Sequence, residues 1–413
     1  QTRTATATFA PFAMNGGNST KEYEGKAQAI FIPSVMAAYK WQDFVFSGSF
    51  AIVGGGGTLK FDNGLPMFEA GVLGTQVAPG QTFAQALGAL NGVAGSVGYA
   101  GAPLGYSLNM NLEGTSITYG TQLGVTYKIN DMFSGFVGAR ASFVTNGYDG
   151  YLRDVAVTNG AAVKAHLNAT ADALESIAPG DAAALRGAAG TITALEQGVS
   201  TQSIELDTQQ SGWGIAPILG VNFNYEKLNV GVKYDFKTDI TLKNDTKKDA
   251  IVDGTPMFPD GAKSHYDIPA LLSVGASYKF LDDKLTASAG YHVFFDKDAD
   301  YSGDSHRALD GNLREWLAGV EYQICDHFLI SAGGQLTRQG VTDAYLSDLS
   351  FTSNSYSIGM GTKIKITEKL SANVAYFFTN YEDYTKKNTF GPNSKTVYSR
   401  TNNAFGIGLD YKF

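Results

Sequence analysis

The chain ends in a run in which large apolar residues occupy every second position. Phe405, Ile407, Leu409, Tyr411 and Phe413 alternate with small or polar residues. Because side chains alternate across a strand, this run predicts a strand with one apolar face and one small or polar face. A strand that ends the chain on an aromatic residue suits a barrel that closes on its own first strand.

The same alternation recurs along the chain and predicts fourteen strands. They span residues 4–13, 28–41, 43–53, 115–129, 132–144, 211–225, 227–238, 266–280, 284–296, 312–325, 327–338, 354–366, 369–379 and 402–413. Very short turns alternate with long connections, among them the loops 54–114 and 145–210. An even strand number with short turns at one end and long loops at the other is typical of outer-membrane barrels. We therefore expect an all-β fold: one transmembrane antiparallel β-barrel domain over residues 1–413 in the bacterial outer membrane.

Two of the long loops carry helical patterns. Apolar residues fall near one helical face in 161–177, and after Pro179-Gly180 a second helix is expected from Asp181 to about Leu195. A shorter helix is expected over 81–95. Loops of this length are usually functional.

Composition supports the barrel and excludes several other classes. Mean hydropathy is -0.10 and no stretch approaches the ~18–20 consecutive apolar residues of a transmembrane helix, but barrel strands bury only alternate residues in lipid. The net charge of -8 argues against a nucleic-acid partner. One cysteine, Cys325, and scattered histidines predict neither a disulfide nor a metal site, and we expect no cofactor. Gln1 stands directly before a strand-like segment, so we expect a mature or trimmed chain whose upstream part is missing.

The run Gly54-Gly55-Gly56-Gly57 follows a predicted strand and leads to Thr58-Leu59. It can be a flexible strand exit. It can also mark a break in the barrel wall, because glycine-rich strands pair weakly.

Alternation turns several ionisable residues toward the lumen, including Arg140, His292 and Lys363. The ordinary interpretation is that they hydrate a polar interior. A catalytic pair of His292 with Ser288 is a less favoured alternative, and we expect no enzyme.

The long loops also carry large apolar residues, which need a reason outside a membrane. They can pack the loops into a cap, or they can form a capture groove for an apolar ligand. The candidates for ligand binding are Leu65, Met67, Phe68, Phe83, Leu87 and Phe258.

Two stretches resemble the FadL-type long-chain fatty-acid and hydrocarbon transporters. They are Trp213–Tyr234, which contains Trp-Gly-Ile-Ala-Pro-Ile-Leu-Gly, and Asp267–Tyr291, in which Pro269-Ala270 leads to Gly275 and Tyr278. The resemblance implies a barrel of the same strand number, capture in a loop groove, and lateral exit through a kinked strand into the membrane. It also implies an N-terminal hatch, for which this chain shows no counterpart.

We therefore expect a monomeric channel for passive uptake of hydrophobic molecules, with long-chain fatty acids as the leading substrate. Expected partners are outer-membrane lipid and lipopolysaccharide, the ligand, and the barrel-assembly machinery through Phe413. The main alternative is a general porin for small polar solutes, which would have a charged constriction formed by an inward-folded loop. A lipid-acting enzyme and an adhesin that uses the helices of 160–198 are further alternatives.

Overall fold

The computed structural model describes residues 1–252 and 255–413, and over these residues fourteen wall positions form one closed antiparallel β-barrel. Three of the positions are shared by two consecutive strands each. In order around the barrel the wall consists of β1 (Thr2–Thr8), β2 (Thr20–Gln28) with β3 (Ser34–Trp41), β4 (Phe44–Phe61), β7 (Gly105–Lys128), β8 (Phe133–Thr158), β9 (Ile204–Tyr225), β10 (Leu228–Asp235) with β11 (Thr241–Lys248), β14 (Lys263–His265) with β15 (Leu271–Phe280), β16 (Leu285–Phe294), β17 (Gly311–Cys325), β18 (Phe328–Gly340), β19 (Ser355–Lys365), β20 (Leu370–Tyr381) and β22 (Lys395–Tyr411).

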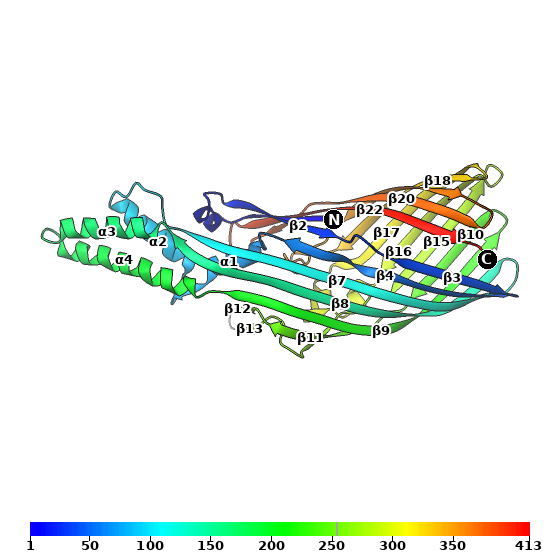
Figure 1. Ribbon diagram of the computed structural model, residues 1–413, viewed down its shortest axis with the longest axis horizontal. Helices are drawn as coiled ribbons and strands as arrows, with labels where there is room; N and C mark the ends of the chain where they lie inside the picture. The colour runs from blue at the N-terminus through cyan, green and yellow to red at the C-terminus, as the bar shows by residue number, and fades with distance from the viewer. Residues whose placement is uncertain (253–254) are drawn as a thin grey trace.

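The remaining elements lie in the connections between wall strands. Short strands are β5 (Gln76–Ala78), β6 (Gln81–Thr82), β12 (Ile251–Val252), β13 (Thr255–Pro256) and β21 (Tyr384–Lys387). The helices are α1 (Pro66–Gly74), α2 (Phe83–Ser96), α3 (Gly160–Leu174) and α4 (Pro179–Ser200), with 3-10 turns η1 (Ala10–Met14), η2 (Asp296–Asp298) and η3 (Ser302–Ala308). In Figure 1 the barrel occupies one end of an elongated molecule, and α3 and α4 project from the other. No helix of residues 1–252 and 255–413 is both long and apolar enough to cross a bilayer.

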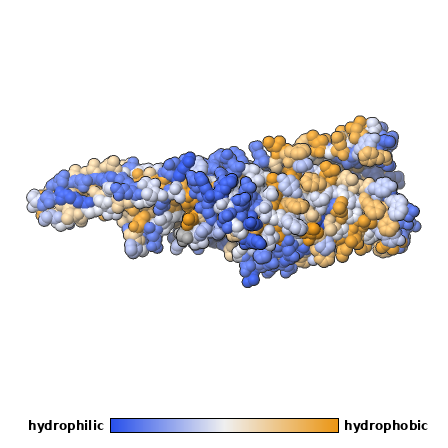
Figure 2. Space-filling model, turned by 60° about the horizontal axis from the view of Figure 1, so that its bottom comes forward, coloured by the Kyte–Doolittle hydropathy of each residue, from blue (hydrophilic) through white to orange (hydrophobic). Residues whose placement is uncertain are grey.

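Apolar side chains cover the end of the barrel that carries the short turns, on the face that Figure 2 shows, and we call this region the apolar belt. Its outward side chains are large and exposed, among them Leu123, Val137, Ile215, Ile358 and Ile407. Pairing between neighbouring strands is most important there, because backbone groups exposed to hydrocarbon have no other partner. The predicted fold and strand number are confirmed.

Several strands continue past the belt, where loops were expected. β4, β7, β8 and β9 extend through residues assigned to the loops 54–114 and 145–210. The ladder between β7 and β8 runs from Gly105, opposite Thr158, to Lys128, opposite Ser134. Above the belt both faces of a strand meet water or protein. The alternation of apolar and polar residues therefore stops there. The end of the pattern shows where the strand leaves the membrane, and the strand itself continues.

Two strands near the start of the chain differ from those that the sequence predicts. Residues 4–13 were expected as one strand, but β1 ends at Thr8 and η1 follows, with Pro11 in its first turn, because proline cannot donate to a ladder. Residues 28–41 were also expected as one strand. Instead β2 and β3 share that wall position and are separated by residues 29–33, which end at Pro33.

The barrel closes where β1 pairs with β22. Thr2 lies opposite Thr401 and Thr8 opposite Lys395, while the other edge of β1 pairs with β2. On β1 the inward side chains are Arg3, Ala5 and Ala7, and both alanines are fully buried. The seam therefore joins the two ends of the chain on the side of the barrel that carries the long loops.

Candidate functional site

The interior of the barrel holds a chamber of about 810 Å³. Its wall is contributed by strands from both ends of the chain and by loops that fold over them. Apolar, tyrosine and charged side chains are mixed in the lining, which includes Arg3, Val53, Leu59, Arg140, Tyr148, Ala216, Ile218, Asp235, Phe236, Tyr266, Ile268, Phe294, Tyr301, Tyr345 and Leu349. A chamber of this size accommodates a small amphiphilic or apolar molecule.

The chamber reaches a stretch of wall in which the strand pairing is interrupted. β2 pairs with β4 as far as Gln28–Thr58, and β3 resumes the pairing at Ser34–Ala51. Between these points residues 29–33 face residues 52–57 of β4 without a ladder. Val53, Gly54, Gly55 and Gly57 line the chamber at this interruption.

Glycine is required at the centre of this interruption. On the β7 side the register of β4 shifts twice between Ile52 and Gly57, so a β-bulge lies there. Gly55 has a φ of +88°, and a Cβ on it would collide with the backbone carbonyl of Ser116. The glycine run was expected to leave the sheet or to break it. In the structure β4 continues through it as a bulged strand to Phe61.

An inward-folded loop, residues 341–354 between β18 and β19, covers the chamber. We call it the roof loop. Leu346 and Phe351 are buried against Ala5 and Tyr398 on the seam strands. Asp348 accepts hydrogen bonds from the Tyr398 hydroxyl at 2.5 Å and from the backbone N–H of Met67 at 2.8 Å. Burial raises the pKa of the Asp348 carboxyl. This residue thus connects the roof loop both to the barrel wall and to α1.

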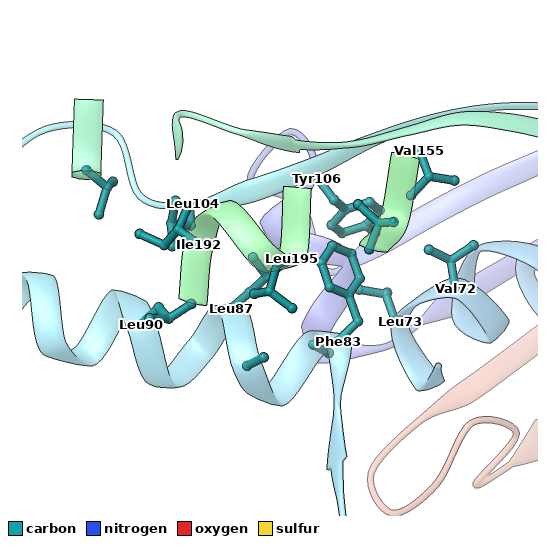
Figure 3. Close-up of a cluster of buried hydrophobic side chains, with 14 of the residues drawn as sticks. Val72, Leu73, Phe83, Leu87, Leu90, Leu104, Tyr106, Val155, Ile192 and Leu195 are labelled. Atoms are coloured by element: carbon teal, nitrogen blue, oxygen red, sulfur yellow. The ribbon is translucent and has the colours of Figure 1, made fainter. Parts of the chain in front are cut away.

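Above the roof loop, α1 to α4 form a packed cap. Figure 3 shows its core, in which Phe83 and Leu87 from α2 lie near Leu73, Tyr106 and Ile192. The structure therefore places Leu65, Phe83 and Leu87 in fully buried positions. Met67 and Phe68 are half-buried, and Phe258 stacks on Tyr148 with ring centroids 5.2 Å apart. The six candidate ligand residues are thus part of the cap and its rim, and Phe68 also lines a small apolar pocket with Leu152, Leu206 and Met257.

A buried carboxylate holds the cap together. Glu69 on α1 accepts hydrogen bonds from Lys21 Nζ at 2.6 Å, from the Tyr23 hydroxyl at 2.5 Å and from the Tyr106 hydroxyl at 2.6 Å. Burial, and next the negative charge of Glu69, raise the pKa of both tyrosines. The sequence did not predict this network, because residues 66–74 lack a helical apolar stripe and α1 was not expected.

The predicted lumen residues lie at different levels. Arg140 lines the chamber and donates to Asp235 at 2.7 Å and to Gln122 at 2.9 Å. His292 lines a lower cavity of about 420 Å³ and lies 3.1 Å from Glu315, with no hydrogen bond to Ser288 among the described residues. Lys363 lies still closer to the short turns and pairs with Asp410 at 2.9 Å. The catalytic alternative therefore finds no assembled pair in the structure.

Comparison with known proteins identifies the fold. No protein-family model matches the sequence, and no curated protein matches it. Among solved structures, a FadL homologue of Pseudomonas aeruginosa is similar with a TM-score of 0.57 and 13% identity, over 100% of this chain and 89% of that one. The Pseudomonas putida toluene transporter TodX is similar with a TM-score of 0.53 and 12% identity, over 100% of this chain and 89% of that one. The chain is thus an outer-membrane β-barrel with the fold of the FadL-type transporters.

Proposed function

We propose that this protein is a passive outer-membrane channel for hydrophobic molecules. The observation that carries the proposal is the contact between the chamber and the interrupted pairing beside β4. A molecule in the chamber is separated from the lipid there by a wall without a continuous ladder. The similar structures include a toluene transporter, which supports an apolar cargo.

The route we propose has three stages. Capture takes place at the cap through Leu65, Met67, Phe68, Phe83, Leu87 and Phe258. Because several of these side chains are buried, capture requires the helices to separate. The chamber then receives the molecule once the roof loop moves, and the bond from Met67 to Asp348 links these two steps.

Exit is lateral, through the opening between residues 29–33 and Gly54–Gly57. The neighbouring Phe50 is an exposed large apolar residue, so the opening lies at the upper part of the lipid-facing belt. Burial of apolar surface in lipid stabilises the released molecule by roughly 25 cal/mol per Å². No energy source is needed. Long-chain fatty acids and similar molecules are the cargo we propose.

The porin alternative predicts a charged constriction. The roof loop does fold inward, but Leu346, Leu349 and Phe351 supply its packed side chains, and Asp348 is already hydrogen-bonded. An apolar roof favours a hydrophobic cargo over polar solutes.

Filling the chamber tests the route. Ala216 faces the chamber and is buried, whereas its neighbour Ile215 faces outward and is exposed. We expect Ala216→Trp to reduce the uptake of a fluorescent long-chain fatty acid into proteoliposomes about tenfold, and Ile215→Trp to leave it near the wild-type rate. Equal uptake by both folded variants would contradict passage through the chamber.

Photo-crosslinking provides an independent measurement. A diazirine-bearing fatty acid bound in detergent should label peptides that contain residues 52–59 and 345–350. Labelling confined to lipid-facing positions such as Ile215 and Ile407 would exclude an interior route.

A further inference from the structure

The strand pairing of the wall is interrupted a second time, at the edge of β9 that faces β10 and β11. The ladder between β9 and β10 ends where Ile218 lies opposite Asp235. The ladder between β9 and β11 begins where Ser211 lies opposite Lys243. Between these points, among the described residues, residues 212–217 have no ladder partner on this edge. The first interruption lies between the second and third wall positions, and this one lies between the sixth and seventh.

The segment that follows β10 passes across the inner face of β9. Gly212 and Gly214 share that face with Ala216, which is buried and lines the chamber. A Cβ on Gly214 would collide with the carbonyl oxygen of Asp239, and a Cβ on Gly212 with that of Thr241. Glycine in a strand often marks such a close approach of another backbone. The segment is therefore displaced into the barrel and leaves this edge of β9 without a neighbouring strand.

A buried carboxylate fixes this inward course. Asp267, in the connection between β14 and β15, accepts hydrogen bonds from the backbone N–H of Ile240 and from Lys237 Nζ, both at 3.0 Å. The backbones of Thr238 and Ile268 exchange two hydrogen bonds, at 2.9 and 3.0 Å. The segment is thus held to the strand position of β14 and β15 and away from β9, so the interruption is a built feature of the wall.

Phe236 lies at this interruption and reaches both sides of the wall. Tyr234 of β10 lies opposite Leu219, whose side chain is exposed on the outer face of β9, so Tyr234 also points outward. The Phe236 ring packs edge-on against Tyr234, with ring centroids 4.8 Å apart, and the residue is 39% exposed. Phe236 also lines the chamber. One side chain therefore separates the chamber from the outer surface here.

Both ends of this passage suit an apolar molecule. On the outside, the unpaired edge of β9 carries Trp213 and Ile215, which are large and exposed, so the passage opens at the apolar belt. On the inside, the chamber wall beside Phe236 is largely apolar and includes Ala216, Ile218, Ile268, Pro269 and Leu271. A hydrocarbon chain would exchange one apolar environment for another.

We propose that Phe236 closes a second lipid-facing opening, through which apolar molecules dissolved in the membrane enter the chamber. The inference rests on the proposed function, since both openings serve the same chamber. It adds a loading route that bypasses the cap. Because Phe236 contacts both surfaces, rotation of its ring away from the edge of β9 opens the passage.

Closing the first opening isolates the second. A Cβ on Gly57 would lie 3.2 Å from that of Ala29, close to the ~3.8 Å of a disulfide, so Ala29→Cys with Gly57→Cys can be oxidised across the first opening. Cys325→Ser removes the free, exposed cysteine. The probe is an uncharged diazirine-bearing alkane dissolved in the membrane of proteoliposomes. The rate at which it labels residues 345–350 in the chamber is measured by flash photolysis and mass spectrometry.

We expect the oxidised protein to be labelled in the chamber at a reduced rate. In this background Phe236→Ala should raise the rate severalfold, because it removes the ring that closes the passage, and Phe236→Trp should lower it severalfold. Phe223→Ala is the matched control. Phe223 also packs in an aromatic group, with its ring centroid 5.0 Å from that of Phe133, but it lies near the short turns, away from the chamber. Its removal should leave the rate unchanged.

The outcomes separate the second opening from the proposed function. If oxidation abolishes chamber labelling and reduction restores it, the opening beside β4 is the only lateral route and the second opening is wrong. If the Phe236 variants label as the control does, Phe236 closes no passage. If the probe labels the chamber in no variant, reduced or oxidised, the proposed function fails together with this inference. Heat-modifiable electrophoretic mobility confirms that each variant is a folded barrel.

Discussion

At the scale of single residues, buried charge organises the cap and the chamber. Glu69 is almost fully buried and accepts four hydrogen bonds, from Asn15, Lys21, Tyr23 and Tyr106. Removing one partner of a buried, hydrogen-bonded pair is strongly destabilising, because the remaining groups stay desolvated. The cap should therefore depend on this one carboxylate.

We expect Glu69→Ala to lower the free energy of cap opening by about 3 kcal/mol, because Lys21, Tyr23 and Tyr106 lose their acceptor. Hydrogen exchange in α2 should accelerate accordingly, while exchange in β16 to β20 should not change. Glu22→Ala, at an exposed position of β2, is the matched control. Unchanged protection of α2 in Glu69→Ala would show that the helices hold without the network.

Residue positions inside the barrel were predictable only where alternation is strong. The alternation in β8 predicts an inward Arg140, and in the structure this residue lines the chamber. Arg3 and Arg400 come from opposite ends of the chain and meet only through the β1–β22 register. No local pattern in the sequence indicates that these two residues lie opposite each other.

At the scale of elements, β4 combines a wall strand with a bulge. Its glycines occupy backbone conformations that side chains rarely adopt, at Gly55 and Gly57. Because Gly55 also approaches the β7 backbone closely, the bulge requires glycine at this position.

Gly55→Ala should force β4 and β7 apart at Ser116 and lower the thermal stability of the barrel, by about 2 kcal/mol for strain at a positive φ combined with the close contact. Gly406→Ala on β22 is the control, because a Cβ there meets no atom within 4 Å. Thermal unfolding followed by circular dichroism compares the two variants. Equal melting temperatures would mean that the bulge relaxes freely.

Strand boundaries were predicted well where one face of a strand meets lipid, because apolar and polar residues alternate there. Elements outside the apolar belt were predicted less well. Strands β16 to β20 were predicted to within about two residues. The break between β2 and β3 was not, because residues 29–32 are apolar and continue the expected pattern. The roof loop has no periodicity, and its position follows from long-range contacts such as Asp348 with Met67.

At the scale of the whole molecule, the barrel and the cap are stabilised by different interactions. The barrel depends on a closed ladder, and the cap on the buried apolar core shared by the four helices and the upper strands. α4 contributes Ile192 and Leu195 to that core, so the helical hairpin is part of the cap and not an appendage (Figure 3).

Replacing residues 160–198 by a short glycine-serine linker should leave the barrel folded and make α1 and α2 sensitive to protease. Uptake of fatty acid should change severalfold, since the cap is part of the proposed route. A chain that transports at the wild-type rate and loses only adhesion to a surface would instead favour the adhesin alternative. Heat-modifiable mobility, limited proteolysis and proteoliposome uptake report these outcomes separately.

The seam has a consequence for how the molecule matures. β1 and β22 lie far apart in the sequence, so every contact between them waits until both strands are in the barrel. The packing of the roof loop against Ala5 and Tyr398 therefore exists only after these two strands have paired. An intermediate with an open seam has strands but no packed roof over the chamber. Order in the roof loop would then report completed assembly of the barrel.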